Sequence, residues 1–223
     1  MTEQSIVPSH VRAQPDKQEQ KSNFLKKAKV FFTGFETDET AKKQFFGDIG
    51  LVPPEVEKLS YLFHGTNERH RASRSTSPKV KKDPIFWADS ITRALFFIES
   101  RIFEKAQNMS QREFNHELRD DRELWQPVLY IAKAKDILRD IKTGKREKID
   151  AELAEEVMQT TGELQEEQVL TIRTSSELEK LEDYFVQKDP RLKKYFSVHI
   201  QRWKEHEKRV GKVEQEIGRS RDL

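Results

Sequence analysis

The apolar residues of this chain come in short runs, and this feature limits the fold more than any other. The longest purely apolar runs in the 223 residues span five positions, as at residues 94–98. A helix that crosses a membrane needs about 20 consecutive apolar residues, so we expect no transmembrane segment. Short strands interleaved with helices fit such runs, and the chain is long enough to bury a substantial core.

Composition excludes several classes of function. The absence of cysteine rules out disulfide scaffolds, cysteine-rich zinc sites and thiol nucleophiles. Lys and Arg total 41 against 39 Asp and Glu, and this net charge of +2 does not favour a surface that binds nucleic acid throughout. Glycine-rich nucleotide-binding motifs and the His-x-x-x-His zinc motif do not occur. We therefore predict no metal cofactor.

The polar N-terminus bears on where the protein acts. Its first 23 residues contain no apolar stretch typical of a secretory signal peptide. We expect a soluble, cytoplasmic protein that does not contact membranes, and delivery as an effector by a signal-independent route stays open.

Periodicity divides the chain into four segments. Residues 1–22 are polar and aperiodic, which predicts a disordered tail. Residues 23–58 form an N-terminal helical extension, with helices at 23–33 and 38–46, and residues 59–175 form the core. In the C-terminal helical extension, residues 176–223, Ser176 and Glu179 make a capping box, and a long helix follows Pro190 to about Ile217.

The core reads as short strands alternating with helices, which predicts an α+β fold. Strands are expected at residues 61–63, 85–88, 127–132 and 169–173. Asp89 or Ser90 caps a helix with an apolar stripe, and polar helical sequence continues to about Glu123. The stripe consists of Ile91, Leu95, Ile98 and Ile102. A further helix begins at Asp150 and ends before Gly162.

Three sequence pieces lie at these strands: LFHGT at 62–66, IFWADSITRALFF at 85–97, and EEQVL at 166–170. Together they resemble the ADP-ribosyltransferase superfamily, in the branch with a His–Tyr–Glu signature that includes poly(ADP-ribose) polymerases and diphtheria-type toxins. The resemblance covers about residues 60–175. It implies an ADP-ribosyltransferase-like core of two packed small sheets, with helical extensions at both ends.

The resemblance implies NAD as substrate and two catalytic residues. Splitting NAD at its nicotinamide bond makes a ribosyl oxocarbenium ion, which a carboxylate can stabilise. Glu167 matches that carboxylate, with Glu166 as a lesser alternative; the register of the Arg–Ser–Glu branch would fall on Gln168. His64, placed at a strand end, matches the histidine that hydrogen-bonds the ribose.

The remaining donor-binding residues also follow from the resemblance. Gly65 lets the backbone approach the nicotinamide amide, and Thr66 completes the His-Gly-Thr motif. Phe86 and Phe97 are placed to sandwich the nicotinamide ring. Two arginines of a basic loop at residues 67–83 would neutralise the pyrophosphate, namely Arg69 and Arg71.

This chain departs from the family at two positions. Phe86 stands where the family has Tyr, and Ala94 stands where it has a nicotinamide-binding Ser. Each candidate also has a purely structural interpretation: His64 as a buried hydrogen-bonded histidine, the aromatic residues as core, Glu167 as one solvated acid, and the basic loop as a solvated loop.

We therefore predict a mono-ADP-ribosyltransferase that transfers ADP-ribose to a macromolecule, more readily protein than nucleic acid. The alternatives are an inactive binding module of the same fold, and a nucleic-acid ADP-ribosyltransferase or RNA 2′-phosphotransferase-like enzyme. A toxin, effector or phage factor fits by family analogy alone.

The C-terminal helix carries a heptad pattern with two seam histidines and one glycine, which disfavour a dimeric coiled coil. The seam residues are Phe196, Trp203, Val210 and Ile217, with Leu192, His199, His206 and Val213. We predict a monomer in which this seam packs on the N-terminal helices.

Overall fold

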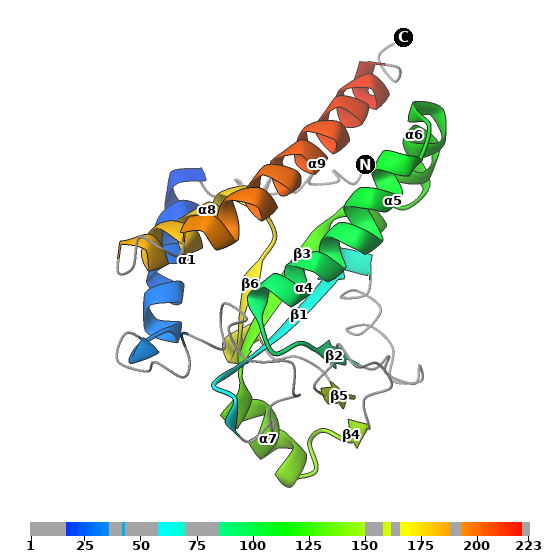
Figure 1. The fold of residues 1–223 in the computed structure, drawn as a ribbon. Coiled ribbons are helices and arrows are strands. Elements are labelled where there is room, and N and C mark those ends of the chain that lie inside the picture. Colours follow the sequence, from blue (N-terminus) through cyan, green and yellow to red (C-terminus); the bar gives the residue numbers. More distant parts are fainter. Residues whose placement is uncertain are drawn as a thin grey trace, which may run out of the picture.

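The computed structural model describes residues 17–35, 42, 58–69, 85–149, 158–161, 166–187 and 193–219. Helices and short strands alternate along this part of the chain, and the strands form two three-stranded antiparallel sheets (Figure 1). The fold is therefore α+β with two small packed sheets, as the sequence predicted.

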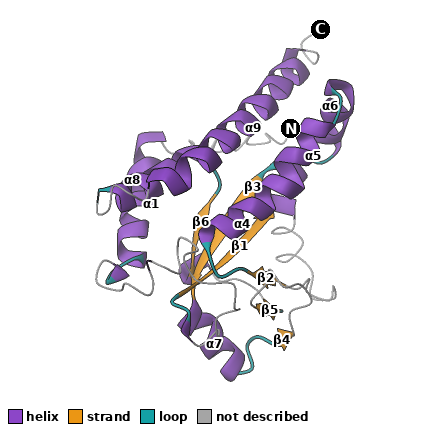
Figure 2. Ribbon diagram, in the orientation of Figure 1, coloured by secondary structure: helices purple, strands orange, loops and turns teal. Residues whose placement is uncertain are grey.

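The first sheet has the order β1-β3-β6. Its strands are β1 (Tyr61–Asn67), β3 (Pro127–Lys133) and β6 (Val169–Ile172). The second sheet, of order β2-β5-β4, contains β2 (Ile85–Trp87), β5 (Met158–Thr160) and β4 (Lys148–Ile149). One bridge joins the two sheets, in which Phe63 and Ala88 exchange backbone hydrogen bonds of 3.0 and 2.7 Å. Figure 2 shows β1, β3 and β6 beside α4, with the short strands toward α7.

Residues 91–125 form the predicted helical stretch in several pieces. They are α4 (Ile91–Ile98), the π-helical η3 (Glu99–Phe103), α5 (Glu104–Asn108), α6 (Gln111–Asp120) and the 3₁₀ turn η4 (Arg122–Trp125). Ser90 caps α4 by accepting a hydrogen bond from the Arg93 amide. Ser110 interrupts the stretch because it forms a capping box with Glu113 and starts α6. The predicted apolar stripe is buried throughout.

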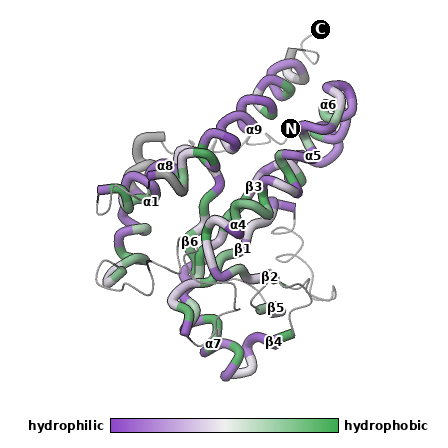
Figure 3. Tube along the Cα trace, viewed as in Figure 1, coloured by the Kyte–Doolittle hydropathy of each residue, from purple (hydrophilic) through white to green (hydrophobic). Residues whose placement is uncertain are grey.

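Alternation along the first sheet builds two cores, one on each face. One face packs against the helices through Phe63, Leu129, Ile131, Leu170 and Ile172. The other faces the second sheet and α7 (Ala134–Lys142) through Leu62, Val128, Tyr130, Ala132 and Val169. Figure 3 shows the resulting hydrophobic stretch along β6. The two sheets thus share the second core.

The N-terminal helix α1 (Lys17–Phe31) starts earlier than predicted, inside the segment expected to be a disordered tail. Phe24, Ala28 and Phe31 are buried, Val30 is exposed, and Gly34 follows with a positive φ of 85°. Lys42 is helical, and the rest of the helix predicted at 38–46 lies outside the described residues.

Two local predictions around the second half of the core are wrong. The helix predicted between Asp150 and Gly162 does not extend over residues 158–160, which form β5 and pair with β2 and β4; the first part of that helix lies outside the described residues. The capping box before α8 (Ser175–Val186) is made by Thr174 and Glu177. Glu179, the predicted partner, is ion-paired with Lys204 instead.

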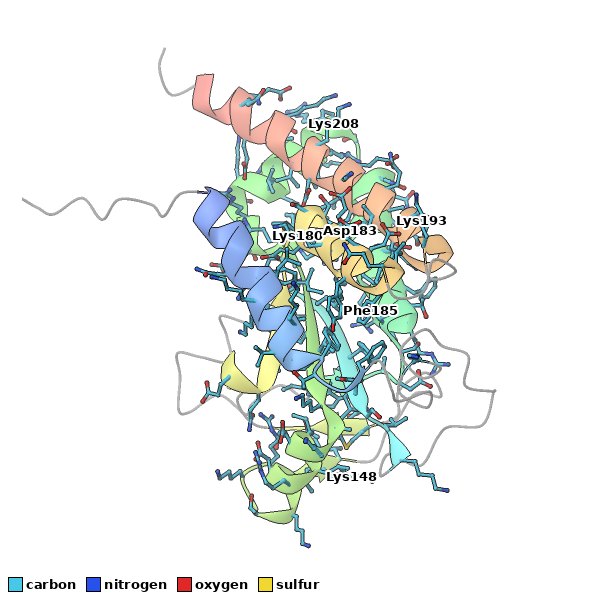
Figure 4. The ribbon with its side chains drawn as sticks, turned by 90° about the vertical axis from the view of Figure 1, so that its left-hand side faces the viewer. Lys148, Lys180, Asp183, Phe185, Lys193 and Lys208 are labelled. Atoms are coloured by element: carbon cyan, nitrogen blue, oxygen red, sulfur yellow. The ribbon has the colours of Figure 1, made fainter. Side chains whose placement is uncertain are left out.

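The long helix α9 (Lys193–Arg219) buries Phe196, Trp203, His206 and Val213 of the predicted seam, and in the described residues it packs mainly on α8, η3, α4 and α6 rather than on α1. Phe196 stacks on Phe185 of α8 with ring centroids 6.3 Å apart, and Trp203 contacts Phe103 of η3 at 6.1 Å. Phe32 reaches Phe185 from the other side, at 5.1 Å. Figure 4 shows α8, with its labelled Phe185, between α1 and α9. The helix α8 therefore packs against α9 where the sequence predicted α1.

Candidate functional site

His64 lies within β1 rather than at its end, because the strand continues through Gly65 and Thr66 to Asn67. The side chain is 5% exposed, and its Nδ1 lies 2.8 Å from the backbone carbonyl oxygen of Phe86. A carbonyl oxygen only accepts, so Nδ1 carries the hydrogen. In the neutral ring Nε2 is then the acceptor, which suits a hydroxyl donor.

Two aromatic side chains fix the plane of the His64 ring. Tyr130 on the neighbouring strand β3 lies nearly parallel to it, with centroids 6.1 Å apart and an interplanar angle of 8°. Trp87 contacts it at 6.1 Å, and the Trp87 indole donates to Thr160 Oγ1 at 3.0 Å. His64 is therefore held between strands of both sheets.

Gly65 has a packing role that the sequence did not indicate. A Cβ at this position would lie 2.3 Å from the Ala94 carbonyl oxygen and 2.9 Å from Ile98 Cγ1. Any larger residue would therefore push α4 off β1. Ala94 is fully buried beneath this contact.

Gly65 also lies where β1 and β2 separate. Phe63 bonds to Ala88 through both its backbone groups, and this bridge does not continue into a ladder. Backbone groups of a strand alternate in direction, so the N–H and C=O of Gly65 point to the same edge as those of Phe63. One donor and one acceptor at such an edge match a carboxamide.

The two predicted ring-binding phenylalanines are half-buried on different elements. Phe86 lies on β2, between the buried Ile85 and Trp87. Phe97 lies on α4, with the Arg101 guanidinium 5.5 Å from its ring centroid. No ring contact joins the two among the described residues.

The basic residues of the site are only partly described. Arg69 forms a 2.7 Å ion pair with Asp121, and its side chain is 60% exposed. Arg71 lies outside the described residues, as do the other residues of the basic loop from 70 to 83. Thr66 is half-buried on β1.

Glu167 is exposed in the 3₁₀ turn η5 (Glu166–Gln168), directly before β6. In the sheet register, Val169 is level with Leu62, whereas His64 is level with Thr171, and β3 lies between. At the usual spacings, the backbones of Val169 and His64 are about 12 Å apart. The structure therefore does not bring Glu167 and His64 into contact, and a ligand would have to span the two.

Sequence reasoning missed a polar cluster behind this turn. Gln168 Nε2 donates to Asp140 Oδ2 at 2.9 Å, and Arg146 Nε lies 3.6 Å from the same oxygen. Asp140 is 4% exposed and Arg146 5% exposed. The contact joins residues 28 positions apart, so no local sequence pattern predicts it.

No family model matches the chain, and no match was found among curated proteins or among solved structures. Within the part of the chain that the structure describes, no group of three His, Asp or Glu side chains is placed to hold a metal ion. In the same residues, no helix is long and apolar enough to cross a membrane.

Proposed function

We propose that the protein is a mono-ADP-ribosyltransferase of the His–Tyr–Glu branch that cleaves NAD and transfers ADP-ribose to a macromolecular acceptor, with protein favoured over nucleic acid. The observation that carries the proposal is the position of His64. It lies where β1 and β2 separate, its Nδ1 is held by the Phe86 carbonyl, and the backbone groups of Gly65 point to the same edge. Two of the three resembling motifs therefore meet at one place.

Each side chain has a role that fits its geometry. His64 Nε2 accepts a hydrogen bond from a ribose hydroxyl, and the Gly65 backbone pairs with the nicotinamide carboxamide. The bond between ribose C1′ and nicotinamide breaks, and its electron pair leaves with nicotinamide. The acceptor nucleophile attacks C1′ and loses its proton. Glu167, exposed in the turn before β6, stabilises the positive charge on the ribosyl group. None of these roles requires a metal.

Labelled NAD tests this proposal directly. The protein is incubated with a cell lysate and NAD labelled in its adenylate part, and nicotinamide release is measured alongside. We expect label on protein, and loss of label in the Glu167→Gln variant. Label on nucleic acid would favour the nucleic-acid alternative, and no nicotinamide release by the folded protein would contradict the transferase.

A second candidate function is an inactive binding module of the same fold. The exposed position of Glu167 away from His64 favours it, together with Phe86 and Ala94 in place of Tyr and Ser. Thermal shift separates the candidates, because a ligand raises apparent stability only if the native state binds it.

For the donor site, we expect a shift with NAD or nicotinamide that His64→Ala weakens and Phe86→Tyr keeps or increases. A shift without nicotinamide release would identify the binding module. No shift at millimolar ligand would contradict a donor site at His64.

A further inference from the structure

The end of α7 carries a polar cluster of the buried Asp140 and Arg146 and the half-buried Gln168. After Lys142 the chain reverses at Gly144, whose φ is 73°. The amides of Lys145 and Arg146 both donate to the Asp140 carbonyl, at 2.9 and 3.1 Å. This C-terminal capping motif turns the chain back along the helix. The Arg146 side chain is thereby buried beside the Asp140 carboxylate.

Gln168 links this cluster to the turn that carries Glu167. A carboxylate only accepts, so the Gln168 amide nitrogen must face Asp140, as the 2.9 Å contact has it. This hydrogen bond is half-buried, and a hydrogen bond to a charged acceptor is among the stronger polar interactions in a protein. Arg146 balances the Asp140 charge in the same buried space.

Glu167, in contrast, is exposed and has no hydrogen bond or ion pair of its own among the described residues. The backbone of η5 therefore sets only the direction of its Cα–Cβ bond, and Gln168 anchors that backbone one residue later. The strand that follows is fixed by its pairing with β3.

We propose that Asp140 is a positioning residue that acts through Gln168 to fix the Glu166–Gln168 turn, and with it the position from which the Glu167 side chain extends. The catalytic part of this inference rests on the proposed function. The anchoring of the turn does not rest on the proposed function, because it can be measured in a protein that is not turning over substrate.

The variant Gln168→Met removes the amide and keeps the length of the side chain. We expect faster hydrogen exchange of the backbone amides in the turn, and a fall in kcat for nicotinamide release of about ten- to a hundredfold. The KM for NAD should stay within about twofold, because Glu167 acts in the transition state. The matched control is Gln201→Met, which removes a similar bond to Glu205 on the exposed face of α9.

A length swap provides the rescue. Asp140→Glu and Gln168→Asn each disturb the contact by one methylene group, and the double variant restores the total length. We expect the double variant to recover both slow exchange and kcat relative to Gln168→Asn.

Three outcomes separate this inference from the proposed function. Unchanged exchange of the turn in Gln168→Met would overturn the anchoring, whatever the activity. Faster exchange with unchanged kcat in an active enzyme would overturn the positioning role. Faster exchange in a protein that never cleaves NAD would support the anchoring while the transferase proposal fails.

Discussion

Glu167 is the residue on which the proposed chemistry depends most. Its carboxylate is exposed in η5, so Glu167→Gln removes a charge without opening a cavity. We expect the fold to be kept, NAD binding to change little, and turnover to fall by about 10²-fold or more, as for loss of one preorganised electrostatic group. Nicotinamide release under single-turnover conditions measures this. Full activity in Glu167→Gln, with Glu166→Gln inactive, would show that the carboxylate of Glu166 stabilises the ribosyl cation instead.

Gly65 offers a second test at the scale of one residue. An added Cβ would meet the Ala94 carbonyl at 2.3 Å, and a backbone atom cannot swing aside. We expect Gly65→Ala to lower the free energy of unfolding by about 1–3 kcal/mol, the usual cost of overpacking. Gly211→Ala is the control: it lies inside α9 with open space around it, and should raise stability by about 1 kcal/mol. Denaturant titration compares them. Equal effects would mean that β1 and α4 are not packed this closely.

At the scale of elements, two buried titratable groups hold α9 to the η3–η4 region. Burial alone raises the pKa of Glu99, but hydrogen bonds and charge from His199 and Arg202 more than offset this, so its pKa lies below the usual value. Burial lowers the pKa of His206, whose Nε2 donates to the Trp125 carbonyl at 2.8 Å. Arg209 pushes the His206 pKa in the same direction, and the hydrogen bond opposes it.

The depressed pKa of His206 predicts how stability depends on pH. Above about pH 6.5 the histidine is neutral in both states, and its contribution is fully present. As pH falls below that value the unfolded state takes up the proton first, so stability falls, by up to about 1.4 kcal/mol per pH unit, until the folded state also protonates. Glu99 adds a similar loss below about pH 4.5.

Denaturant unfolding at several pH values measures this dependence. The slope between about pH 6.5 and 5 should be smaller in His206→Gln. His116→Gln, at a histidine whose side chain is 78% exposed, serves as the control. An unchanged slope in His206→Gln would contradict a buried neutral histidine.

Elements with a strong local signal were predictable from the sequence. The strands β1 and β3 follow from short apolar runs and β6 from alternation. Capping chemistry placed the start of α4 at Asp89 or Ser90, and Ser90 is the cap. The strand β5 was not predictable, because its three residues form a strand only through pairing with the two-residue β4 and with β2, which is distant in the chain. In the candidate site, His64 and Phe86 were expected together from the motifs. The Asp140–Gln168 contact depends on tertiary packing alone, so no pattern in the sequence marks it.

For the whole molecule, the question is whether α9 is part of the core or an arm that selects the acceptor. Phe196, Trp203 and Val213 are fully buried, and each buried side chain of this kind contributes about 1.5–3 kcal/mol. Removing α9 would also expose Phe103 and Phe185, which it covers. A structural role therefore follows from the packing.

We expect the full chain to be a monomer, and a truncation after Pro190 to lose solubility and aggregate, because the apolar surface that α9 covers becomes exposed. Light scattering on both proteins measures this. Gln201→Met in the full chain serves as the comparison, since it alters one exposed contact within α9 and leaves the buried face of the helix unchanged. The opposite result would be a truncation that stays folded and monomeric and still releases nicotinamide from NAD, but no longer labels its acceptor. That result would make α9 a substrate-recognition arm, because the fold and the cleavage of NAD would not depend on it.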